Sequence, residues 1–347
     1  MIDVDVPAYV YDLAALDAHA GMVRAALPGI ELYYAVKANP DPKLLEVLAD
    51  HVDGFEVSSG GEYNHVRGRF GARVAFGGPG KTDGELLLAA DAYRVHVESP
   101  NELRRLLATG ADADVLLRAN LRLDVGGAAL EMSGPFGMDE DGLAECLPLF
   151  TDRVRLRGLH AHLASGLPAP RLLEVAARVL AHPYDEINVG GGMAVSYADP
   201  SEMFDWAAYG RGLAALRRTG QVVRIEPGRA LTAYCGSYVT RVIDVKRVHG
   251  EMFAVLHGGT HHLRTPVTKG HDQPFTVLPT GSGPSLDGPV TLVGQLCTPK
   301  DVFARNIHTS LRVGDTVVFA MAGAYAWNIS HHDFLMHPKP DFHYLSR

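Results

Sequence analysis

The chain has 347 residues, of which 47% are hydrophobic and 21% charged, and its formal net charge is -8. This length exceeds one ordinary domain and predicts either one large barrel or a barrel with a companion domain. The negative charge argues against nucleic acid as a partner, because contacts to phosphates need clustered lysine and arginine. The chain opens without a secretory signal and no apolar run approaches about 18 residues, so we expect a cytoplasmic protein without a membrane span.

Cysteine and histidine usage bears on redox state and metal binding. The three cysteines are Cys146, Cys235 and Cys297. Because their number is odd and their spacing wide, we expect reduced thiols and not a disulfide framework. The pairs His261-His262 and His331-His332 raise the alternative of a metal site, but adjacent residues of a strand point to opposite faces. We therefore expect no bound metal.

The first predicted elements are a strand from Pro7 to Tyr11 and an alanine-rich helix that runs to about Leu27, with Asp12 as its N-cap. We assign residues 1–27 to this strand and helix, and we expect the strand to pack with a C-terminal β-domain. From Leu32 to Glu226, short strands rich in valine and leucine then alternate with amphipathic helices. The alternation is typical of a parallel sheet, and its eight strands are enough to close a barrel. We predict an α/β fold whose (β/α)8 TIM-type barrel covers residues 28–234.

Beyond about Tyr234 the pattern changes to alternating strands without helices between them. The expected strands lie at 238–245, 252–256, 290–293 and 316–319. They predict an antiparallel β-domain over residues 235–347. The stretch 265–288 is rich in proline, glycine and threonine and predicts a loop.

One lysine stands out at the end of the first barrel strand. The stretch reads Tyr33-Tyr34-Ala35-Val36-Lys37-Ala38-Asn39-Pro40, which places Lys37 in apolar surroundings. Burial favours the neutral amine, and a neutral amine forms an imine with an aldehyde such as pyridoxal phosphate (PLP). The alternative is a lysine that extends to the surface from a strand end. We favour the first interpretation because later strand ends supply further parts of a phosphate and pyridine site.

Three later strand ends carry those parts. In the segment from His160 to Ser165 a histidine can stack on a flat ring and a serine can reach a phosphate, although the segment also suits a plain strand end. The run Gly190-Gly191-Gly192 leaves backbone amides unshielded for an anion, and its alternative is a flexible turn. Glu226 can keep a pyridine nitrogen protonated while Arg229 binds phosphate, unless the two form only a salt bridge.

The ordered motifs YAVKAN, HLAS, GGG, EPGR, GQLCTPKD and GAY resemble those of the fold type III PLP-dependent decarboxylases. This family includes ornithine, arginine and diaminopimelate decarboxylases and is related to alanine racemase, and the resemblance covers essentially the whole chain. It implies pyridoxal 5'-phosphate as cofactor, Lys37 as its covalent anchor, His162 as the stacked residue and Glu226 as the pyridine partner. The other positions that it implies at or near the cofactor are Glu56, where the family often has aspartate, Glu62, Arg118, Ser165, Gly190, Gly191, Gly192, Arg229 and Tyr325.

The resemblance also implies a homodimer with shared sites. In this family a cysteine and an aspartate of the neighbouring subunit complete each site, and Cys297 and Asp301 match them. A strand-end cysteine is otherwise read as core filling. A free thiol near the reacting carbon can donate a proton after carbon dioxide leaves.

Departures from the family pattern bear on the substrate. Thr298 stands where the diamine-forming and diaminopimelate enzymes carry an acid that helps to hold the far end of the substrate. The segments around Arg264 and His331 resemble decarboxylases of carboxylate-type siderophore pathways, of the staphyloferrin and achromobactin type, whose substrate is an amino acid conjugated to citrate. The candidate substrate donors, each equally suited to a structural role, are His261, His262, Arg264, His331 and His332.

The sequence therefore favours decarboxylation of an amino acid or of its citryl-type conjugate. Three alternatives stay open: a diaminopimelate or other basic amino-acid decarboxylase, an amino-acid racemase and a non-catalytic PLP-binding protein. Alanine racemases place an arginine at the pyridine nitrogen, where this chain has Glu226. Non-catalytic single-barrel PLP proteins stop where this chain continues with the segment that contains Cys297 and Tyr325.

Overall fold

A computed structural model describes residues 5–123, 126–131, 134–264 and 272–346. The chain forms two compact units. One comprises Ala18–Ala194 and Met203–Leu231, and the other Met1–Asp17, Val195–Glu202 and Thr232–Arg347. The sequence-based boundaries after residues 27 and 234 therefore differ from the observed divisions after Asp17 and Leu231. Among the described residues, every helix is too short or too polar to cross a membrane.

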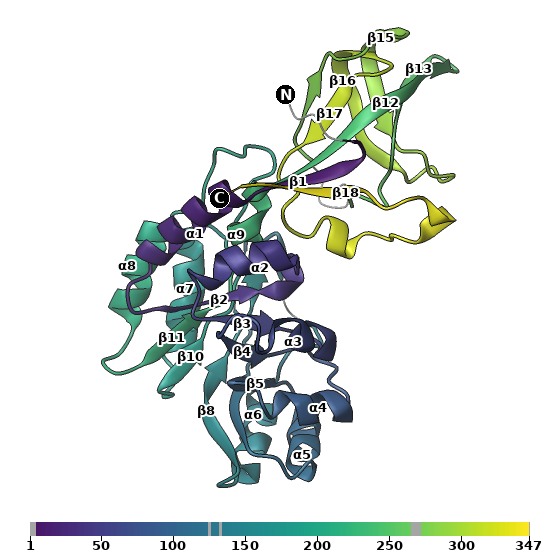
Figure 1. Ribbon diagram of the computed structural model, residues 1–347. Helices are drawn as coiled ribbons and strands as arrows, with labels where there is room; N and C mark the ends of the chain where they lie inside the picture. The colour runs from purple at the N-terminus through teal and green to yellow at the C-terminus, as the bar shows by residue number, and fades with distance from the viewer. Residues whose placement is uncertain (1–4, 124–125, 132–133, 265–271, 347) are drawn as a thin grey trace. The chain divides into compact units, whose positions relative to one another are not determined.

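The first unit is a closed barrel of eight parallel strands, as predicted (Figure 1). Around the barrel the strands follow the order β10-β11-β2-β3-β4-β5-β6-β8. Their bounds are β2 (Glu31–Ala35), β3 (Gly54–Val57), β4 (Arg73–Phe76), β5 (Arg94–Val97), β6 (Ala113–Arg118), β8 (Val154–His160), β10 (Glu186–Asn188) and β11 (Val222–Ile225). Because all eight strands are parallel, their carboxyl ends meet at one rim, where barrel enzymes place their sites.

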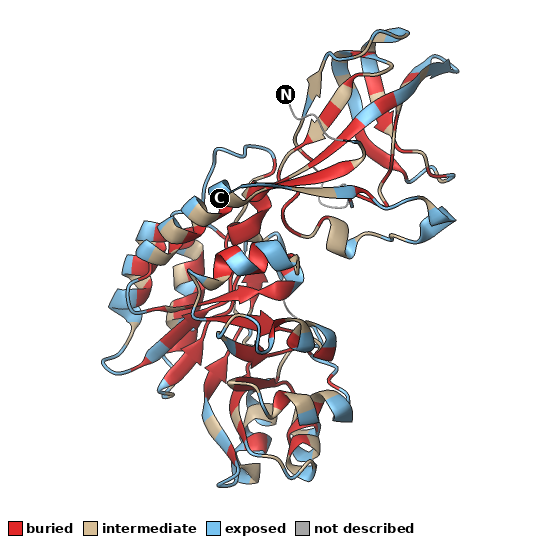
Figure 2. Ribbon diagram, viewed as in Figure 1, coloured by how far each residue is buried: buried red, intermediate tan, exposed pale blue. Residues whose placement is uncertain are grey.

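Burial explains why the barrel closes. Strand residues such as Leu32, Phe55, Val95 and Leu116 are fully buried, and Figure 2 shows the barrel strands in the colour of buried residues. The outer helices present one apolar face to them, as in α7, where Leu172, Val175 and Val179 are buried among exposed neighbours. These helices are α1 (Leu13–Ala25), α2 (Pro42–Ala49), α3 (Gly60–Val66), α4 (Asp83–Ala89), α5 (Pro100–Ala108), α6 (Glu140–Cys146), α7 (Ala169–Leu180), α8 (Trp206–Leu216) and α9 (Arg229–Thr232).

Side-chain caps fix where the helices begin after the strands. The hydroxyls of Ser59, Thr82 and Ser99 accept hydrogen bonds from backbone amides in the first turns of α3, α4 and α5. Thr82 and Glu85 form a complete capping box, in which each side chain accepts a hydrogen bond from the backbone of the other. The strand-to-helix turns at the barrel rim are therefore held locally.

A buried ionic network fills the opposite end of the barrel. Arg224 on β11 is fully buried and donates to Glu186 over 2.8 Å. Arg94 on β5 donates to Glu186 at 2.6 Å, and Glu31 on β2 accepts from Nε of Arg224 at 3.0 Å. One buried carboxylate thus serves two guanidinium groups from different strands. Such a network needs every partner, since a buried charge without one is strongly destabilising.

We expect Glu186→Gln to lower the free energy of unfolding of the barrel by about 3–5 kcal/mol, because both guanidinium groups lose their shared charge. The matched control is Asp112→Asn, whose ion pair with Arg153 is exposed and should contribute less than about 1 kcal/mol. Urea titration followed by Trp206 fluorescence in a Trp327→Phe background measures the barrel. Equal losses in the two variants would contradict the role given to the network.

The second unit is built on an eight-stranded sheet. Its main path is β14-β17-β12-β13-β15-β16, and β1 lies between β12 and β18. The bounds are β1 (Ala8–Asp12), β12 (Gly236–Val248), β13 (Glu251–Leu256), β14 (Phe275–Leu278), β15 (Ser285–Val293), β16 (Val302–Arg312), β17 (Thr316–Phe319) and β18 (Asp341–Leu345). The N-terminal strand β1 pairs antiparallel with β12, next to the β-domain strands of the C-terminal half.

This sheet differs from the expected antiparallel domain in two ways. It is mixed, because β1 pairs parallel with β18 and β13 pairs parallel with β15. Parallel neighbours need a long connection, and the chain between β13 and β15 supplies one. The stretch 265–288 was predicted as a loop, yet it contains β14 and the start of β15. Its residues 265–271 lie outside the described part of the chain.

Candidate active site

Lys37 lies at the rim of the barrel, in a short 3-10 turn (Val36–Ala38) directly after β2. Its neighbours Val36 and Ala38 are buried, but the lysine side chain is 45% exposed and forms an ion pair with Glu56. The expectation that apolar groups enclose the ammonium of Lys37 is therefore wrong, because this side chain is partly exposed and has a carboxylate partner. At the barrel rim the lysine is paired with the buried carboxylate of Glu56.

Glu56 projects from β3 and is 5% exposed. Besides Lys37, it accepts a hydrogen bond of 2.9 Å from the hydroxyl of Ser58. Glu62 accepts a bond of 2.7 Å from the backbone amide of the same serine, and burial raises the pKa of the Glu62 carboxyl. Two carboxylates and a serine therefore surround the turn that holds Lys37.

The triglycine run follows β10 and packs against His162. The backbone amide of Gly191 donates to Nδ1 of His162 at 3.0 Å, so this nitrogen carries no proton. Burial lowers the pKa of His162 to about 3, which agrees with a neutral ring. Gly190 and Gly192 have φ angles of 71° and 101°, and a Cβ on Gly192 would lie 2.3 Å from the carbonyl oxygen of Ala164. Only glycine fits this close cradle.

Two of the predicted phosphate positions, Ser165 and Arg229, follow barrel strands. The amide of Gly166 donates to the carbonyl of Gly192 at 2.8 Å, which holds Ser165 on β9 (Ala164–Ser165) beside the triglycine run. Arg229 opens helix α9. The loop before it is tied to the lysine turn, because the amide of Ala35 donates to the carbonyl of Pro227 at 3.1 Å.

Glu226 follows β11 and is 7% exposed. Its Oε1 accepts a hydrogen bond of 2.6 Å from the amide of Asn188, and its Oε2 lies 3.1 Å from Nε2 of His160. The backbone amide of Glu226 donates to the carbonyl of Gly190 at 2.8 Å. A buried carboxylate is thereby fixed next to the glycine cradle, with hydrogen bonds from two neighbouring strands.

Arg118 ends β6 and forms a buried ion pair with Glu98, with 2.6 Å between Nη1 and Oε1. The other oxygen of Glu98 accepts the amide of Gly137 at 3.1 Å. Arg118 thus fixes the loop that follows its own strand. A direct contact with a cofactor, which the sequence suggested, stays a prediction.

Sequence reasoning assigned no role to several residues that the barrel brings to the site. They are Ser58, His96, Glu98 and Asn188. Asn188 directly precedes Val189 and the three glycines, so its position at a strand end was a signal for it. His96 had no comparable signal, because its contacts join strands that are remote in the sequence.

In the β-domain, three segments that contain the remaining predicted residues are joined at one end of the sheet. Asp301 is 2% exposed and accepts hydrogen bonds from the amides of Thr260 and Leu296 at 2.7 and 2.8 Å. Gln295 accepts from the amide of Gly258 at 2.9 Å and contacts Nδ1 of His337 at 2.7 Å. The carboxylate of Asp301 therefore holds the loop that carries the exposed Cys297. Its contact with a substrate stays a prediction.

The histidines of the β-domain divide into buried and exposed groups. His262 contacts the carbonyl of Pro338 at 2.9 Å and the hydroxyl of Tyr238 at 3.1 Å, and its ring is buried like that of His261. His332 stacks on Trp327 at 3.7 Å. The contacts of His262 and His332 are thus made within the domain, whereas both ring nitrogens of the buried His261 have no hydrogen-bond partner among the described residues, and His331 is exposed.

Arg264 is exposed, and its backbone amide donates to the Ser330 hydroxyl at 3.0 Å, so it lies beside the segment of His331. Tyr325 has a φ of 49°, which is unusual for a residue other than glycine. Thr298 lies between Cys297 and Asp301 in the joined loop, and its carbonyl accepts the amide of Asp301 at 3.2 Å. The exposed candidates Arg264, Cys297 and His331 thus belong to segments that are hydrogen-bonded to one another.

The barrel residues fit PLP by three independent criteria. The turn after β10 is packed so closely that only glycine fits, a buried carboxylate could pair with a cationic ring nitrogen, and a neutral imidazole contacts the same glycines. Lys37 on the neighbouring strand end supplies the amine. A barrel with this set of groups defines a PLP-dependent enzyme. Its candidate partner for the pyridine nitrogen is a carboxylate, whereas alanine racemases have an arginine at that position.

Comparison with known proteins identifies the family. Residues 13–233 match the pyridoxal binding domain of the pyridoxal-dependent decarboxylases. Over 98% of its length the chain is 39% identical to the 2-[(L-alanin-3-ylcarbamoyl)methyl]-2-hydroxybutanedioate decarboxylase of Staphylococcus aureus, of which 94% is covered. The chain belongs to the pyridoxal-dependent decarboxylase family, as predicted, and is a PLP-dependent decarboxylase.

Other relatives agree. The L-glutamyl-[BtrI acyl-carrier protein] decarboxylase of Niallia circulans is 30% identical over 97% of this chain and 88% of its own length. The fold is that of Helicobacter pylori diaminopimelate decarboxylase in complex with L-lysine, with a TM-score of 0.88, 24% identity and coverage of 99% of this chain and 92% of that one. The barrel with an additional β-domain is therefore the fold of this family.

We expect borohydride reduction of the PLP-loaded protein to fix the pyridoxyl group on Lys37, because this is the lysine at the glycine and carboxylate site. Peptide mapping by mass spectrometry identifies the labelled residue, and Lys37→Ala should neither be labelled nor turn over substrate. The matched control is Lys43→Ala, whose side chain is exposed and pairs with Glu46 on α2. A pyridoxyl group on another lysine would overturn the assignment.

Gly192→Ala should abolish PLP binding, because the new Cβ would lie 2.3 Å from the carbonyl of Ala164 and the cradle would have to open. Gly84→Ala is the control, since a Cβ on that helical glycine meets open space. Equilibrium dialysis with PLP measures both variants. Unchanged affinity in a folded Gly192→Ala protein would contradict the cradle as the phosphate site.

Proposed function

We propose that the substrate is an amino acid joined to a carboxylate-rich acid, of the citryl type used in siderophore biosynthesis, and that its amino-acid carboxylate leaves as carbon dioxide. The observation that carries this proposal is the similarity to the S. aureus decarboxylase, which extends over nearly the full length of both chains. That enzyme's name describes L-alanine joined through carbon 3 and an amide to a hydroxybutanedioate, which has two further carboxylates. The N. circulans relative likewise acts on an amino acid that is attached to another group.

Local chemistry supports a far end that is acidic and not basic. A second ammonium on the substrate needs a carboxylate partner, but Thr298 follows Cys297 and the Asp301 carboxylate already accepts hydrogen bonds from Thr260 and Leu296. Arg264 and His331, by contrast, are exposed on adjoining segments. A guanidinium is suited to binding a carboxylate with two parallel hydrogen bonds.

The barrel residues divide the chemistry among them. PLP supplies an electron sink for the electron pair left when carbon dioxide departs. Lys37 would hold the cofactor through its amine, and Glu56 would pair with the charge of that amine whenever it is a free ammonium. Glu226 holds the proton of the ring nitrogen in place, which makes the sink stronger, while the glycine cradle binds the phosphate through backbone amides.

Two of the required groups belong to the β-domain, and we assign them to the neighbouring subunit of a homodimer. Cys297 then reaches the reacting carbon of the partner's substrate and its Sγ donates the proton that replaces the carboxylate. Asp301 acts through the loop by holding Cys297 in position. The exposure of Cys297 and the burial of Asp301 support this division.

Diaminopimelate decarboxylation is the second candidate, because several relatives have this activity, among them the enzyme of Bacteroides thetaiotaomicron at 29% identity over 92% of this chain. One experiment separates the candidates. The PLP-loaded protein is incubated with the citryl conjugate of L-2,3-diaminopropionate, with diaminopimelate and with ornithine. Mass spectrometry of the products measures the loss of carbon dioxide. We expect loss of carbon dioxide from the conjugate at least tenfold faster than from either free amino acid. Preference for diaminopimelate would overturn the substrate proposal and leave the PLP assignment intact.

Mixing two inactive variants tests the shared site. Lys37→Ala and Cys297→Ala should each be nearly inactive, and subunit exchange should restore at most about a quarter of wild-type activity, because about half of the dimers are mixed and each has one intact site. Mass spectrometry of intact dimers verifies the exchange. No recovery despite verified exchange would place Lys37 and Cys297 in the site of one subunit.

Arg264→Ala should raise KM for the citryl conjugate at least tenfold without changing PLP affinity, because a guanidinium paired with a desolvated carboxylate is worth about 2–5 kcal/mol. Arg247→Ala is the control. Arg247 is exposed and lies near the β12–β13 hairpin, at the opposite end of β13 from the segment of Arg264. Equal KM values for the two variants would show that Arg264 does not bind the substrate.

A further inference from the structure

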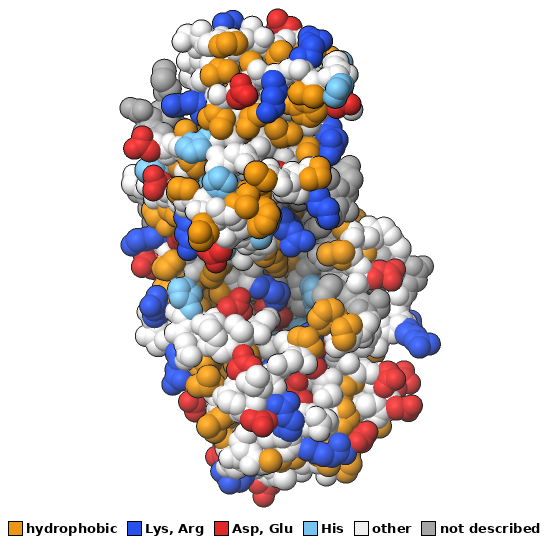
Figure 3. All heavy atoms as spheres, turned by 90° about the vertical axis from the view of Figure 1, so that its right-hand side faces the viewer, with side chains coloured by type: hydrophobic (Ala, Val, Ile, Leu, Met, Phe, Trp, Pro, Cys, Tyr) orange, Lys and Arg blue, Asp and Glu red, His pale blue; other side chains and the backbone are white. Residues whose placement is uncertain are grey.

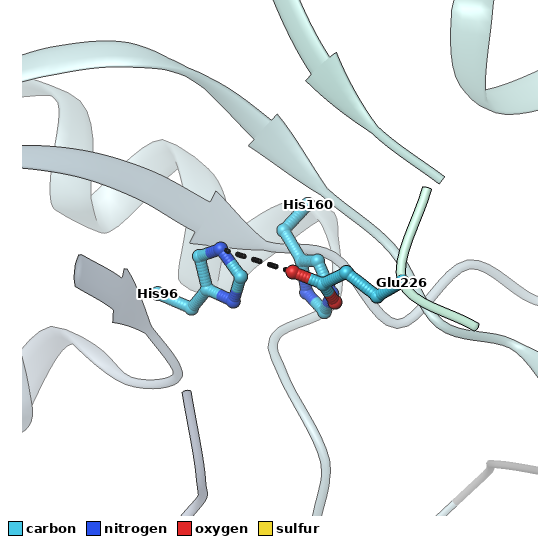
Figure 4. Close-up of side chains that lie close together, drawn as sticks. All are labelled: His96, His160 and Glu226. Atoms are coloured by element: carbon cyan, nitrogen blue, oxygen red, sulfur yellow. Dashed lines mark hydrogen bonds and ion pairs between the residues drawn. The ribbon is translucent and has the colours of Figure 1, made fainter. Parts of the chain in front are cut away.

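Two histidines that have no assigned role lie beside Glu226 inside the barrel. His96 lies in β5 and His160 ends β8, and both are buried, with exposed fractions of 1% and 3%. Figure 4 shows both imidazole rings next to the Glu226 carboxylate group, and the two rings are stacked on each other. Nε2 of His160 lies 3.1 Å from Oε2 of Glu226, and Nε2 of His96 lies 3.8 Å from Oε1. The three side chains bring one ligand atom each within 4.8 Å of one another.

The ring geometry does not suit a chelated metal ion. The two rings are stacked, with centroids 4.2 Å apart and planes inclined by 16°. Imidazole binds a metal along a lone pair in its own ring plane, and a tetrahedral site needs such directions to converge on one point. In nearly parallel stacked rings these directions run side by side. The cluster is therefore better suited to hold protons than to bind a cation.

The protonation of the pair follows from its surroundings. A carboxylate oxygen only accepts, so Nε2 of His160 donates to Glu226, and Nδ1 of His160 is buried without a hydrogen-bond partner among the described residues. Burial lowers the pKa of both histidines well below its ordinary value, and for His96 the stacked His160 lowers it further. Both rings are neutral at physiological pH. Asn188, the third neighbour of the carboxylate, is a neutral donor as well.

We propose that His96 and His160 are positioning residues that act through Glu226: as a stacked neutral pair they hold the carboxylate oriented and ionised, so that the proton of the ion pair stays on the pyridine nitrogen of PLP. Hydrogen bonds donated to a carboxylate favour its charged form. Without them, the carboxylate would be free to turn away from the ring nitrogen, which would then lose the ionic partner of its proton. The electron sink would then be weaker.

Only His160 donates to Glu226, since Nε2 of His96 has no hydrogen-bond partner among the described residues, and His96 acts by stacking on His160. Neutrality of the pair is essential to this arrangement. If a histidine in the pair were cationic, Glu226 would already have its counter-ion and would hold a ring proton less strongly. The fixed cations that face the pair keep the histidines uncharged, since they lower the histidine pKa values in addition to burial. For His160 these are Arg118, Lys37 and Arg224, and for His96 they are Arg224 and Lys81, whose effect on the His96 pKa opposes that of Glu226, which raises it.

His96 is itself anchored from outside the barrel. The buried ammonium of Lys81 donates to the carbonyl of His96 at 2.7 Å and to the carboxylate of Glu102 at 2.8 Å. This contact fixes the end of β5, and stacking then fixes the ring of His160. The geometry of the carboxylate therefore depends on β5, although β5 and β11 are not neighbours in the barrel.

The test is the protonation of the ring nitrogen, read directly by NMR of PLP labelled with nitrogen-15 at that position. Wild type and three variants are loaded with the labelled PLP and titrated. His160→Leu loses the donor, His160→Gln retains an amide donor at the same distance along the side chain, and His96→Phe keeps an aromatic ring for stacking but loses Nε2. No substrate is present, so the result is independent of the substrate assignment.

We expect the ring nitrogen of His160→Leu to lose its proton at a pH lower by at least about one unit than in wild type, and its PLP affinity to fall about tenfold or more. His160→Gln should titrate like wild type, and His96→Phe should lie between the two. Wild-type titration in a folded His160→Leu protein would overturn the proposal and leave the pair a packing feature. If His160→Leu does not fold, His96→Phe decides, and an unchanged titration in that variant overturns the proposal.

Discussion

A buried carboxylate, Glu226, is the charge around which the barrel site is arranged. It has neutral donors from β8 and β10, and its own amide is bonded to the first glycine of the phosphate cradle. The same backbone contacts therefore align the pyridine partner with the phosphate site. Since a buried anion without a cation is costly, the apoprotein is left with an unmet charge that a protonated pyridine ring would satisfy. Affinity for the cofactor and the strength of its electron sink thus have one physical origin.

The β-domain contributes by a different principle. Its candidate groups are on three connecting segments, and one buried aspartate, Asp301, joins two of them through backbone amides. Substrate recognition can therefore change through exposed residues such as Arg264 and His331 while the loop framework stays fixed. Charged side chains of both signs are interspersed over the face of the molecule in Figure 3.

The sequence predicted the barrel, and it placed the candidate site groups of the barrel at strand ends, which meet by geometry in a parallel barrel. It did not reveal contacts between remote strands, such as the stacking of His96 on His160, since nothing near either residue encodes the other. The ion pair of Lys37 with Glu56 was also missed, because the two groups come from different strands and neither stretch of sequence indicates the other. In the β-domain, the parallel pairing of β13 with β15 depends on a long connection between them. The local alternation of apolar and polar residues cannot indicate such a pairing.

Release of labelled carbon dioxide tests the central claim most directly. The citryl conjugate of L-2,3-diaminopropionate is prepared with carbon-13 either in the amino-acid carboxylate or in the citrate carboxylates, and the reaction is run in heavy water. The account predicts labelled carbon dioxide only from the amino-acid carboxylate, with one deuterium at the carbon that carried it. Deuterium at this carbon without release of carbon dioxide would show a racemase, and labelled carbon dioxide from the citrate part would contradict the proposed orientation of the substrate.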